Sequence, residues 1–245
     1  MTIVDSHCHL FDLKNYILPS DIYPIVVGYS HSSNKKAASF QGKYPTVLGI
    51  APQTAIKEGL SSIDEWVDFI HSQKPNAIGE IGLDYKWAEN QEAVEKQRVL
   101  FNRMLELSKS LHLPVVIHSR NNPRENDVEV PKNAIDEILD TLEKQKITKF
   151  LMHFYSGNEL QAQRIVSLGG YVSILALRSK ERKKVINIVP LERLLVESDC
   201  PYVGRNPEIV RDAVGYIAEV KSIKPEKVEV QTTKNAQEFF GFKIC

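Results

Sequence analysis

The sequence has no surplus of either charge, because 31 lysine and arginine residues are balanced by 31 aspartate and glutamate residues. A chain without a net positive field cannot hold nucleic acid non-specifically over its surface, so a polyanionic substrate has to be bound locally. The chain also lacks an apolar run approaching the ~18 residues that cross a bilayer. We therefore expect no association with a membrane.

Cysteine is scarce, with single residues at Cys8, Cys200 and Cys245. Their odd number, the absence of a Cys-x-x-Cys pair and the absence of an apolar secretory region argue against a disulfide framework. This pattern predicts a reducing, cytoplasmic setting. The glycine-rich fingerprint of a dinucleotide-binding fold is also missing, and the chain shows no internal repeat or low-complexity tract.

What the chain does have is a regular succession of short apolar runs rich in β-branched residues. Eight of these runs predict strands, at Thr2–Val4, Pro24–Gly28, Thr46–Ile50, Ala77–Ile81, Pro114–Ile117, Lys149–Met152, Gly170–Ile174 and Leu194–Val196. Helical periodicity follows several of them, at Leu60–His71, Glu92–Leu111, Ala134–Lys144, Leu160–Leu168 and Ile209–Val220. Strands that alternate with helices predict a parallel sheet.

Eight strongly apolar strands in a chain of 245 residues favour an α/β fold of one kind, the closed (β/α)8 or TIM barrel. We expect a single domain over residues 1–245. The first β/α unit is predicted to be abbreviated, because only Phe11–Tyr23, which includes Pro19, separates the first two strands. The polar segment Asn121–Pro131 is predicted to be a long loop that overhangs the catalytic face.

Ionisable side chains recur at the carboxyl ends of the predicted strands, which meet at one mouth of a barrel. They are four histidines and two carboxylates: His7, His9, Glu80, His118, His153 and Asp199. A spacing of two residues in an extended segment directs His7 and His9 to the same side. Six donors exceed what one tetrahedral site needs and suit two ions that share a carboxylate. The sequence therefore predicts a dinuclear metal site.

Other residues of the same types have a structural interpretation. His31 is predicted to lie in a polar loop, and His71 and His112 fall at helix ends, so we treat these three as hydrogen-bonding or surface residues. Cys8 and Cys200 adjoin predicted ligands. Because neighbours on a strand face opposite sides, packing is the favoured role for both cysteines.

Six short motifs follow one another almost from end to end of the chain. They are Asp5-Ser6-His7-Cys8-His9-Leu10, Gly79-Glu80-Ile81-Gly82-Leu83-Asp84-Tyr85, Ile117-His118-Ser119-Arg120, His153-Phe154-Tyr155-Ser156-Gly157, Glu197-Ser198-Asp199-Cys200-Pro201-Tyr202, and Asn235-Ala236 before Phe239-Phe240. Their order and spacing resemble those of the TatD-like metal-dependent hydrolases, the TatD DNase family within the amidohydrolase superfamily.

The resemblance implies a ligand set for each ion. One ion would be held by His7, His9, Glu80 and Asp199, and the second by Glu80, His118 and His153. Members of the family are described as metal-dependent deoxyribonucleases, often with magnesium, which implies DNA or another phosphodiester as the substrate here. Imidazole-rich sites suit zinc, manganese or iron, so Mg²⁺, Mn²⁺ and Zn²⁺ all stay open as the two divalent ions.

The chain departs from the family pattern in loops that would touch the substrate. Gly49-Ile50-Ala51-Pro52 stands where the family usually has Gly-x-His-Pro, and the first helix is expected to be deleted. The stretch between Pro201-Tyr202 and Arg205-Asn206-Pro207 is unusually short. These departures leave every predicted metal ligand in place and bear on the substrate alone.

The expected mechanism uses a metal-bound hydroxide as the nucleophile, with Glu80 bridging the ions and Asp199 orienting the water and accepting its proton. A metal-dependent deacylase, amidase or lactonase is the alternative, because a hydroxide of this kind also attacks carbonyl carbon. Barrel hydrolases of that wider class often use a carboxylated lysine as the bridge, whereas Glu80 favours the nuclease branch. A non-catalytic binding protein fits less well with a full set of six ligands.

Four further residues are predicted to contact the substrate. Arg120 and Arg205 would bind a phosphate through bidentate contacts, and Tyr85 and Tyr155 would stack on a base or sugar. The structural alternative for Arg120 is a salt bridge to a nearby acid such as Asp84 or Glu125. For both tyrosines the alternative is packing at the rim of the barrel.

Overall fold

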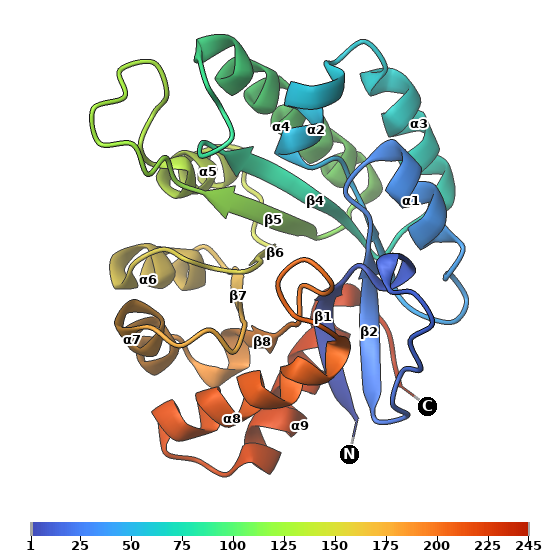
Figure 1. The fold of residues 1–245 in the computed structure, drawn as a ribbon, viewed down its shortest axis with the longest axis vertical. Helices are drawn as coiled ribbons and strands as arrows, with labels where there is room; N and C mark the ends of the chain where they lie inside the picture. The colour runs from blue at the N-terminus through green and yellow to red at the C-terminus, as the bar shows by residue number, and fades with distance from the viewer. Residues whose placement is uncertain (1, 245) are drawn as a thin grey trace.

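Eight strands lie side by side in sequence order in the computed structural model, which describes residues 2–244. They are β1 (Ile3–Cys8), β2 (Ile22–Val27), β3 (Thr46–Leu48), β4 (Ala77–Asp84), β5 (Val115–Arg120), β6 (Phe150–Met152), β7 (Tyr171–Ile174) and β8 (Leu194–Val196). Every neighbouring pair from β1 to β8 is parallel. The helices lie outside the strands (Figure 1), so the predicted (β/α)8 barrel is confirmed.

The barrel is closed by backbone contacts just beyond β8. The amide of Asp199 donates to the carbonyl oxygen of His7 at 2.9 Å, and the amide of His9 donates to that of Cys200, also at 2.9 Å. Cys8 and Cys200 pair as a parallel bridge between these two segments. The first and last strands are therefore joined through the same residues that carry the predicted metal ligands.

Nine α-helices accompany the strands within the described residues. They are α1 (His31–Ala38), α2 (Pro52–Glu58), α3 (Ile63–Gln73), α4 (Gln91–Leu111), α5 (Ala134–Lys144), α6 (Glu159–Ser167), α7 (Lys180–Ile188), α8 (Val210–Lys221) and α9 (Pro225–Phe240). The five helices predicted from periodicity correspond to α3, α4, α5, α6 and α8. Helices α1, α2, α7 and α9 were not predicted.

The placement of His31 in a polar loop was wrong, because His31 is the first residue of α1. The side chain of Ser30 caps this helix by accepting from the amide of Ser33 at 3.2 Å. The buried residues of α1 are Ser33, Asn34 and Ala37. A short helix whose buried face is largely polar has little apolar periodicity, and the pattern therefore indicated a loop.

The abbreviated first unit is confirmed. Between β1 and β2 the only helical segment in the described chain is the 3₁₀ turn η1 (Leu10–Asp12), and no α-helix covers β1 on that side. The carboxyl-terminal helix α9 packs against β1 and β8 instead. Its Phe239 and Phe240 join Val4 and Ile25 in the apolar cluster that fills the inside of the barrel.

The predicted loop at 121–131 is confirmed as a loop, and in Figure 1 it projects beside α5. Arg124 within it donates to the carbonyl oxygens of Tyr85 and Ala88, at 3.3 Å and 2.5 Å, and so ties the loop to the segment that follows β4. Across residues 2–244 no helix is both long enough and apolar enough to span a membrane. The third cysteine, Cys245, lies outside the described residues.

Tyr85 and Tyr155, predicted to stack on substrate, are both buried, with exposed fractions of 0% and 2%. The hydroxyl of Tyr85 donates to Oε2 of Glu137 at 2.6 Å, and that of Tyr155 donates to the carbonyl oxygen of Asn158 at 2.9 Å. Neither ring has an open face. The burial of both rings contradicts the stacking role and favours the packing alternative.

The contact between Tyr85 and Glu137 belongs to a charged cluster that joins β4, α4 and α5. Arg98 in α4 donates from Nε and Nη2 to the two carboxylate oxygens of Glu137 at 2.6 Å and 2.9 Å. Burial on its own would raise the pKa of Glu137, but the hydrogen bonds from Arg98 and Tyr85 hold it below the ordinary value of 4.5. A lowered carboxyl pKa means that the charged form stabilises the fold above the unfolded-state pKa.

We therefore expect Glu137→Gln to lower the free energy of unfolding at pH 7 by about 1.5 kcal/mol, the lower end for hydrogen bonds to charged groups. The difference from the wild type should shrink as the pH falls through the lowered pKa of Glu137, because the native carboxylate is then protonated. Urea denaturation at pH 7 and at a series of pH values falling below 4.5 measures both. The matched control is Glu143→Gln, an exposed partner of Arg164, which should change little. Equal unfolding free energies for Glu137→Gln and the wild type at pH 7 would contradict the expectation.

Candidate metal centre

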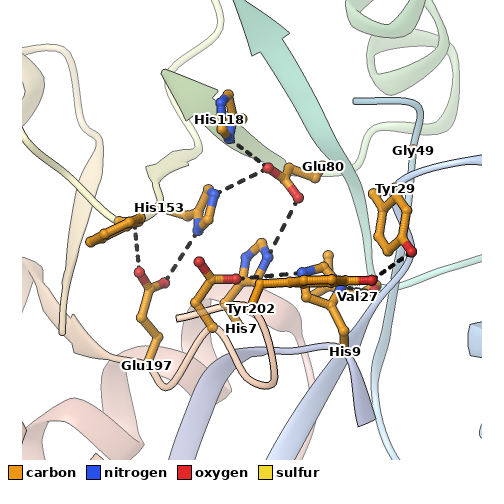
Figure 2. Close-up of polar contacts among 12 residues, drawn as sticks. His7, His9, Val27, Tyr29, Gly49, Glu80, His118, His153, Glu197 and Tyr202 are labelled. Carbon is orange, nitrogen blue, oxygen red and sulfur yellow. Dashed lines mark hydrogen bonds and ion pairs between the residues drawn. The ribbon is translucent and has the colours of Figure 1, made fainter. Parts of the chain in front are cut away.

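All six predicted ligands come together at the carboxyl ends of the strands. Five of them, His7, His9, Glu80, His118 and His153, are labelled in Figure 2. His7 lies in β1, Glu80 in β4 and His118 in β5, whereas His9, His153 and Asp199 directly follow β1, β6 and β8. Each of the six residues is buried, with no more than 7% of its surface exposed. The segments β1, β4 and β5 run further than the apolar pattern predicted, which brings polar residues inside the strands.

The six side chains form two groups whose ligand atoms lie within 4.8 Å of one another. The first group is His7, His9 and Asp199, and the second is Glu80, His118 and His153. In the first, Nε2 of His9 lies 3.5 Å from Oδ1 of Asp199. Each group has enough nitrogen and oxygen donors to hold one divalent ion.

Glu80 connects the two groups, as the dashed lines in Figure 2 show. Its Oε1 lies 2.7 Å from Nδ1 of His118 and 3.2 Å from Nε2 of His153. Its Oε2 lies 3.7 Å from Nε2 of His7. One carboxylate oxygen therefore faces each group, which is the arrangement that a bridging carboxylate requires.

Two of the histidines, His9 and His118, have an acceptor on the ring nitrogen that points away from the cluster. Nδ1 of His9 donates to the carbonyl oxygen of Val27 at 2.7 Å, and Nε2 of His118 donates to Oδ2 of Asp84 at 2.7 Å. Because a carbonyl oxygen cannot donate, Nδ1 of His9 carries a proton, and Nε2 is the ring nitrogen that faces Asp199. Acceptors behind a histidine fix its tautomer and orientation in this way at metal sites.

Two observations test whether these residues fit a metal ion. Both ring nitrogens of His7 are buried and have no hydrogen-bond partner among residues 2–244, which is costly for polar atoms unless something else binds them. The rings of His7 and His153 are also stacked, with centroids 3.8 Å apart, so protonating both would place like charges together. The residues fit a group that accepts electron pairs from the ring nitrogens.

The charge balance of the cluster also suits cations. Burial would raise the pKa of Glu80, but His153, His118 and His7 hold it well below its ordinary value. Burial likewise would lower the pKa of His153, but the carboxylates of Glu80 and Glu197 raise it well above its ordinary value. The buried carboxylate of Glu80 therefore stays ionised and stabilises positive charge at the positions of the histidines.

The backbone places Asp199 by a sharp turn. Its φ is +48°, in the left-handed region that residues other than glycine rarely adopt. The turn is fixed on one side by the amide of Val203, which donates to the carbonyl oxygen of Asp199 at 2.8 Å. On the other side Asp5 accepts from the amide and hydroxyl of Ser198, at 2.9 Å and 2.5 Å. Asp5 thus positions Asp199, and it also accepts from the amide of His7 at 3.2 Å.

The backbone also places Glu80, through a glycine where β4 lies against β5. Gly82 pairs with His118 in the sheet and has a φ of +139°. A Cβ atom at this position would lie 2.0 Å from the carbonyl oxygen of His118. Only glycine therefore allows β4 to approach β5 closely enough to set Glu80 beside His118.

The two arginines predicted to bind phosphate lie in different surroundings. Arg120 follows His118 on β5, its side chain is 38% exposed, and its Nη1 lies 3.7 Å from Oδ2 of Asp84. The contact expected under the structural alternative is therefore present, while part of the guanidinium stays open to a ligand. Arg205 is exposed in the loop after β8 and borders a shallow hollow with Asn206 and Glu208.

Sequence reasoning missed several residues that support the cluster. The buried carboxylates of Asp5, Asp84 and Glu197 belong to the same sequence motifs as predicted metal ligands, and this could have identified them from the sequence. Glu197 accepts from the amide of Phe154 at 2.6 Å and from the hydroxyl of Ser173 at 2.6 Å, and its Oε2 lies 3.7 Å from Nδ1 of His153.

Gln53 was also missed, and it lies next to the departure at Ala51-Pro52. Its Nε2 donates to Oδ2 of Asp84 at 2.7 Å and lies 3.3 Å from Nε2 of His118. Tyr29 and Tyr202 lie beside His9 and were not predicted as site residues. Tyr29 belongs to none of the six motifs, whereas Tyr202 ends the motif that contains Asp199, and this was the only available signal. Their rings lie 5.2 Å and 5.0 Å from that of His9.

Comparisons with known proteins agree with the barrel fold and with a metal-dependent hydrolase. The chain is 28% identical over 270 residues to the human protein named deoxyribonuclease TATDN3, covering 97% of this chain and 94% of that protein. It is 27% identical to an uncharacterized metal-dependent hydrolase of Buchnera aphidicola, covering 98% and 97%. The crystal structure of YJJV, a TatD homolog from Escherichia coli, shares the fold with a TM-score of 0.81 at 23% identity, over 98% of both chains. The family model described as TatD related DNase matches residues 4–241, so the chain belongs to this family of metal-dependent hydrolases.

Proposed function

We propose that the protein is a dinuclear metal-dependent phosphodiesterase that acts on DNA. The observation that carries the proposal is the position of Glu80, whose two oxygens face two separate groups of donors. The first ion would be held by His7, His9, Glu80 and Asp199, and the second by Glu80, His118 and His153. The family model and the name of the human relative support DNA as the substrate.

When bound, two divalent ions lower the pKa of water from about 15.7 toward roughly 7 and stabilise negative charge on phosphoryl oxygens. The protein residues supply the rest of the chemistry. Burial would raise the pKa of Asp199, but His9, His153 and His7 hold it below its ordinary value, so its carboxylate is free to accept a proton. Asp199 is therefore the residue that orients the attacking water and takes its proton at a carboxylate oxygen.

Arg120 is proposed to hold the phosphate beside His118. The exposed part of its guanidinium can donate to two oxygens of one phosphate, and its contact with Asp84 fixes where the group points. Asp84 at the same time holds His118. This arrangement explains how a chain with no net charge can act on a polyanion, because the positive charge is concentrated where the phosphate binds.

We expect close to two divalent ions per chain after reconstitution with Mn²⁺ or Zn²⁺, measured by elemental analysis of protein freed of unbound metal. His118→Ala should remove about one of them, because it takes one of three donors from the second group. The control is His112→Ala, at the exposed end of α4, which should keep both ions. Full activity with no bound metal would end the proposal.

Glu80→Gln should reduce kcat/KM more than ~100-fold, because an amide of the same shape lacks the charge needed to bridge two cations. Steady-state kinetics measures the loss, and thermal melting shows whether the variant still folds. Glu89→Gln, an exposed residue after β4, provides the control and should behave as the wild type. A folded Glu80→Gln with near-normal turnover would assign Glu80 a purely structural role.

The substrate class is tested by direct competition. Single-stranded DNA, single-stranded RNA, a simple aryl phosphodiester, and an ester or lactone are each incubated with the protein in the presence of Mg²⁺, Mn²⁺ or Zn²⁺. We expect turnover of DNA and of the aryl phosphodiester, because the guanidinium of Arg120 can donate to two oxygens of one phosphate. Hydrolysis of the ester or lactone with no cleavage of any phosphodiester would favour a deacylase, amidase or lactonase on the same metal site.

A further inference from the structure

Three aromatic rings surround His9 at the mouth of the barrel, and we refer to Phe11, Tyr29 and Tyr202 as the aromatic rim. Their ring centroids lie 6.2 Å, 5.2 Å and 5.0 Å from that of His9. Each ring meets His9 edge to face, at interplanar angles of 72°, 84° and 66°. One of the two proposed ion sites thus has an aromatic border.

Tyr202 is the exposed member of the rim. It is 58% exposed, an unusual fraction for an aromatic side chain that contacts a buried histidine. Its hydroxyl nevertheless has two partners, Tyr29 Oη at 2.7 Å and Asp12 Oδ2 at 2.8 Å. Figure 2 shows the hydroxyl of Tyr202 against that of Tyr29, and the ring of Tyr202 lies edge to face with that of His9. Because these hydrogen bonds already fix the ring of Tyr202, its side chain has little conformational entropy left to lose when a ligand binds to the exposed ring.

The anchor comes from the abbreviated first unit of the barrel. Asp12 is the last residue of η1, the short turn that takes the place of the first helix. Its other oxygen, Oδ1, lies 3.5 Å from Nζ of Lys36 in α1. Tyr29 also lies within reach of Asp12, with 3.3 Å from its hydroxyl to Oδ2. The loss of the first helix therefore leaves a turn whose carboxylate holds the aromatic rim.

The opposite side of the cluster is polar and cationic. His118 is bordered by Asp84 and Gln53, and the partly exposed guanidinium of Arg120 lies beside them. The site is thus asymmetric, with flat apolar surface next to His9 and a phosphate-binding group next to His118. A ligand that carries a planar ring on one side of a phosphate matches both halves.

We propose, resting on the phosphodiesterase function proposed above, that Tyr202 stacks on the nucleobase beside the scissile phosphodiester and sets which side of the phosphate enters the His9 half of the site. Tyr29 and Asp12 are positioning residues that hold the ring of Tyr202 in place. Stacking tolerates any base because every base has a π-face, so the platform selects nucleic acid strands without selecting a sequence. The competing view is that the rim only ties η1, α1 and the loop after β8 together.

The test compares two short single strands with the same number of phosphates, one with bases throughout and one with abasic residues throughout. Both carry non-hydrolysable phosphonate linkages, and their dissociation constants are measured by fluorescence anisotropy with the metal-loaded protein. Wild-type protein should bind the base-containing strand about 10-fold more tightly, the range expected for one stacked base. Tyr202→Ala should abolish this preference and leave the affinity for the abasic strand unchanged.

Two further variants separate stacking from structure. Tyr202→Phe keeps the ring but loses both hydroxyl contacts, so it should retain most of the preference for bases. Tyr44→Ala removes a tyrosine just before β3, at the opposite end of the barrel, and should retain all of it. Thermal melting confirms that each variant is folded.

The proposal is overturned if Tyr202→Ala binds the base-containing strand with the wild-type preference, or if the wild type has no preference. Loss of affinity for both strands equally, with a lowered melting temperature, would likewise assign the rim a structural role. Cleavage of the matching hydrolysable strands is measured separately. Wild-type protein that cleaves neither strand refutes the phosphodiesterase function, whatever the binding preference, so the two failures are distinguishable.

Discussion

The contacts of one buried carboxylate, Glu80, determine how the rest of the site is organised. A carboxylate that is removed from water needs partners of opposite charge, and Glu80 has three histidines around it instead of lysine or arginine. Histidine nitrogens are cationic only when they hold a proton, and otherwise they offer lone pairs. A metal ion resolves this conflict because it supplies the positive charge and uses the lone pairs at the same time.

This constraint also explains why the site and the closure of the barrel coincide. The backbone bonds that join β1 to the segment after β8 run between His7 and Asp199 and between His9 and Cys200. If the barrel opened at that seam, two ligands of the first group would separate from the third. The seam is packed rather than bonded covalently, with the buried Sγ atoms of Cys8 and Cys200 3.3 Å apart. The small apolar side chains expected there from the sequence therefore serve the metal site indirectly.

Much of the architecture could be predicted from the sequence because parallel strands buried on both faces leave an unambiguous apolar signal. The six candidate ligands could be picked out because they interrupt that signal at the same end of each strand. What could not be predicted depends on tertiary contacts. Tyr85 has the same local sequence context whether its ring faces solvent or Glu137, and only the position of α5 decides between them. The short helix α1 was not predicted because its buried face carries the polar residues Ser33 and Asn34, which leave no apolar periodicity.

The departures from the family pattern fall on both sides of the cluster, in the half around His118 and in the half around His9, and they have a common explanation. Ala51 replaces a histidine near the His118 half, and there Gln53 occupies a hydrogen-bonding position on Asp84. The missing first helix affects the His9 half, and there Asp12 of η1 anchors Tyr202. Each loss is thus accompanied by a contact from a residue close by in the chain. Gln53 lies 3.3 Å from Nε2 of His118, and the ring of the anchored Tyr202 lies 5.0 Å from that of His9. Variation in the loops is therefore free to change how a substrate is held, while the electrostatics that fix the ligands stay constant.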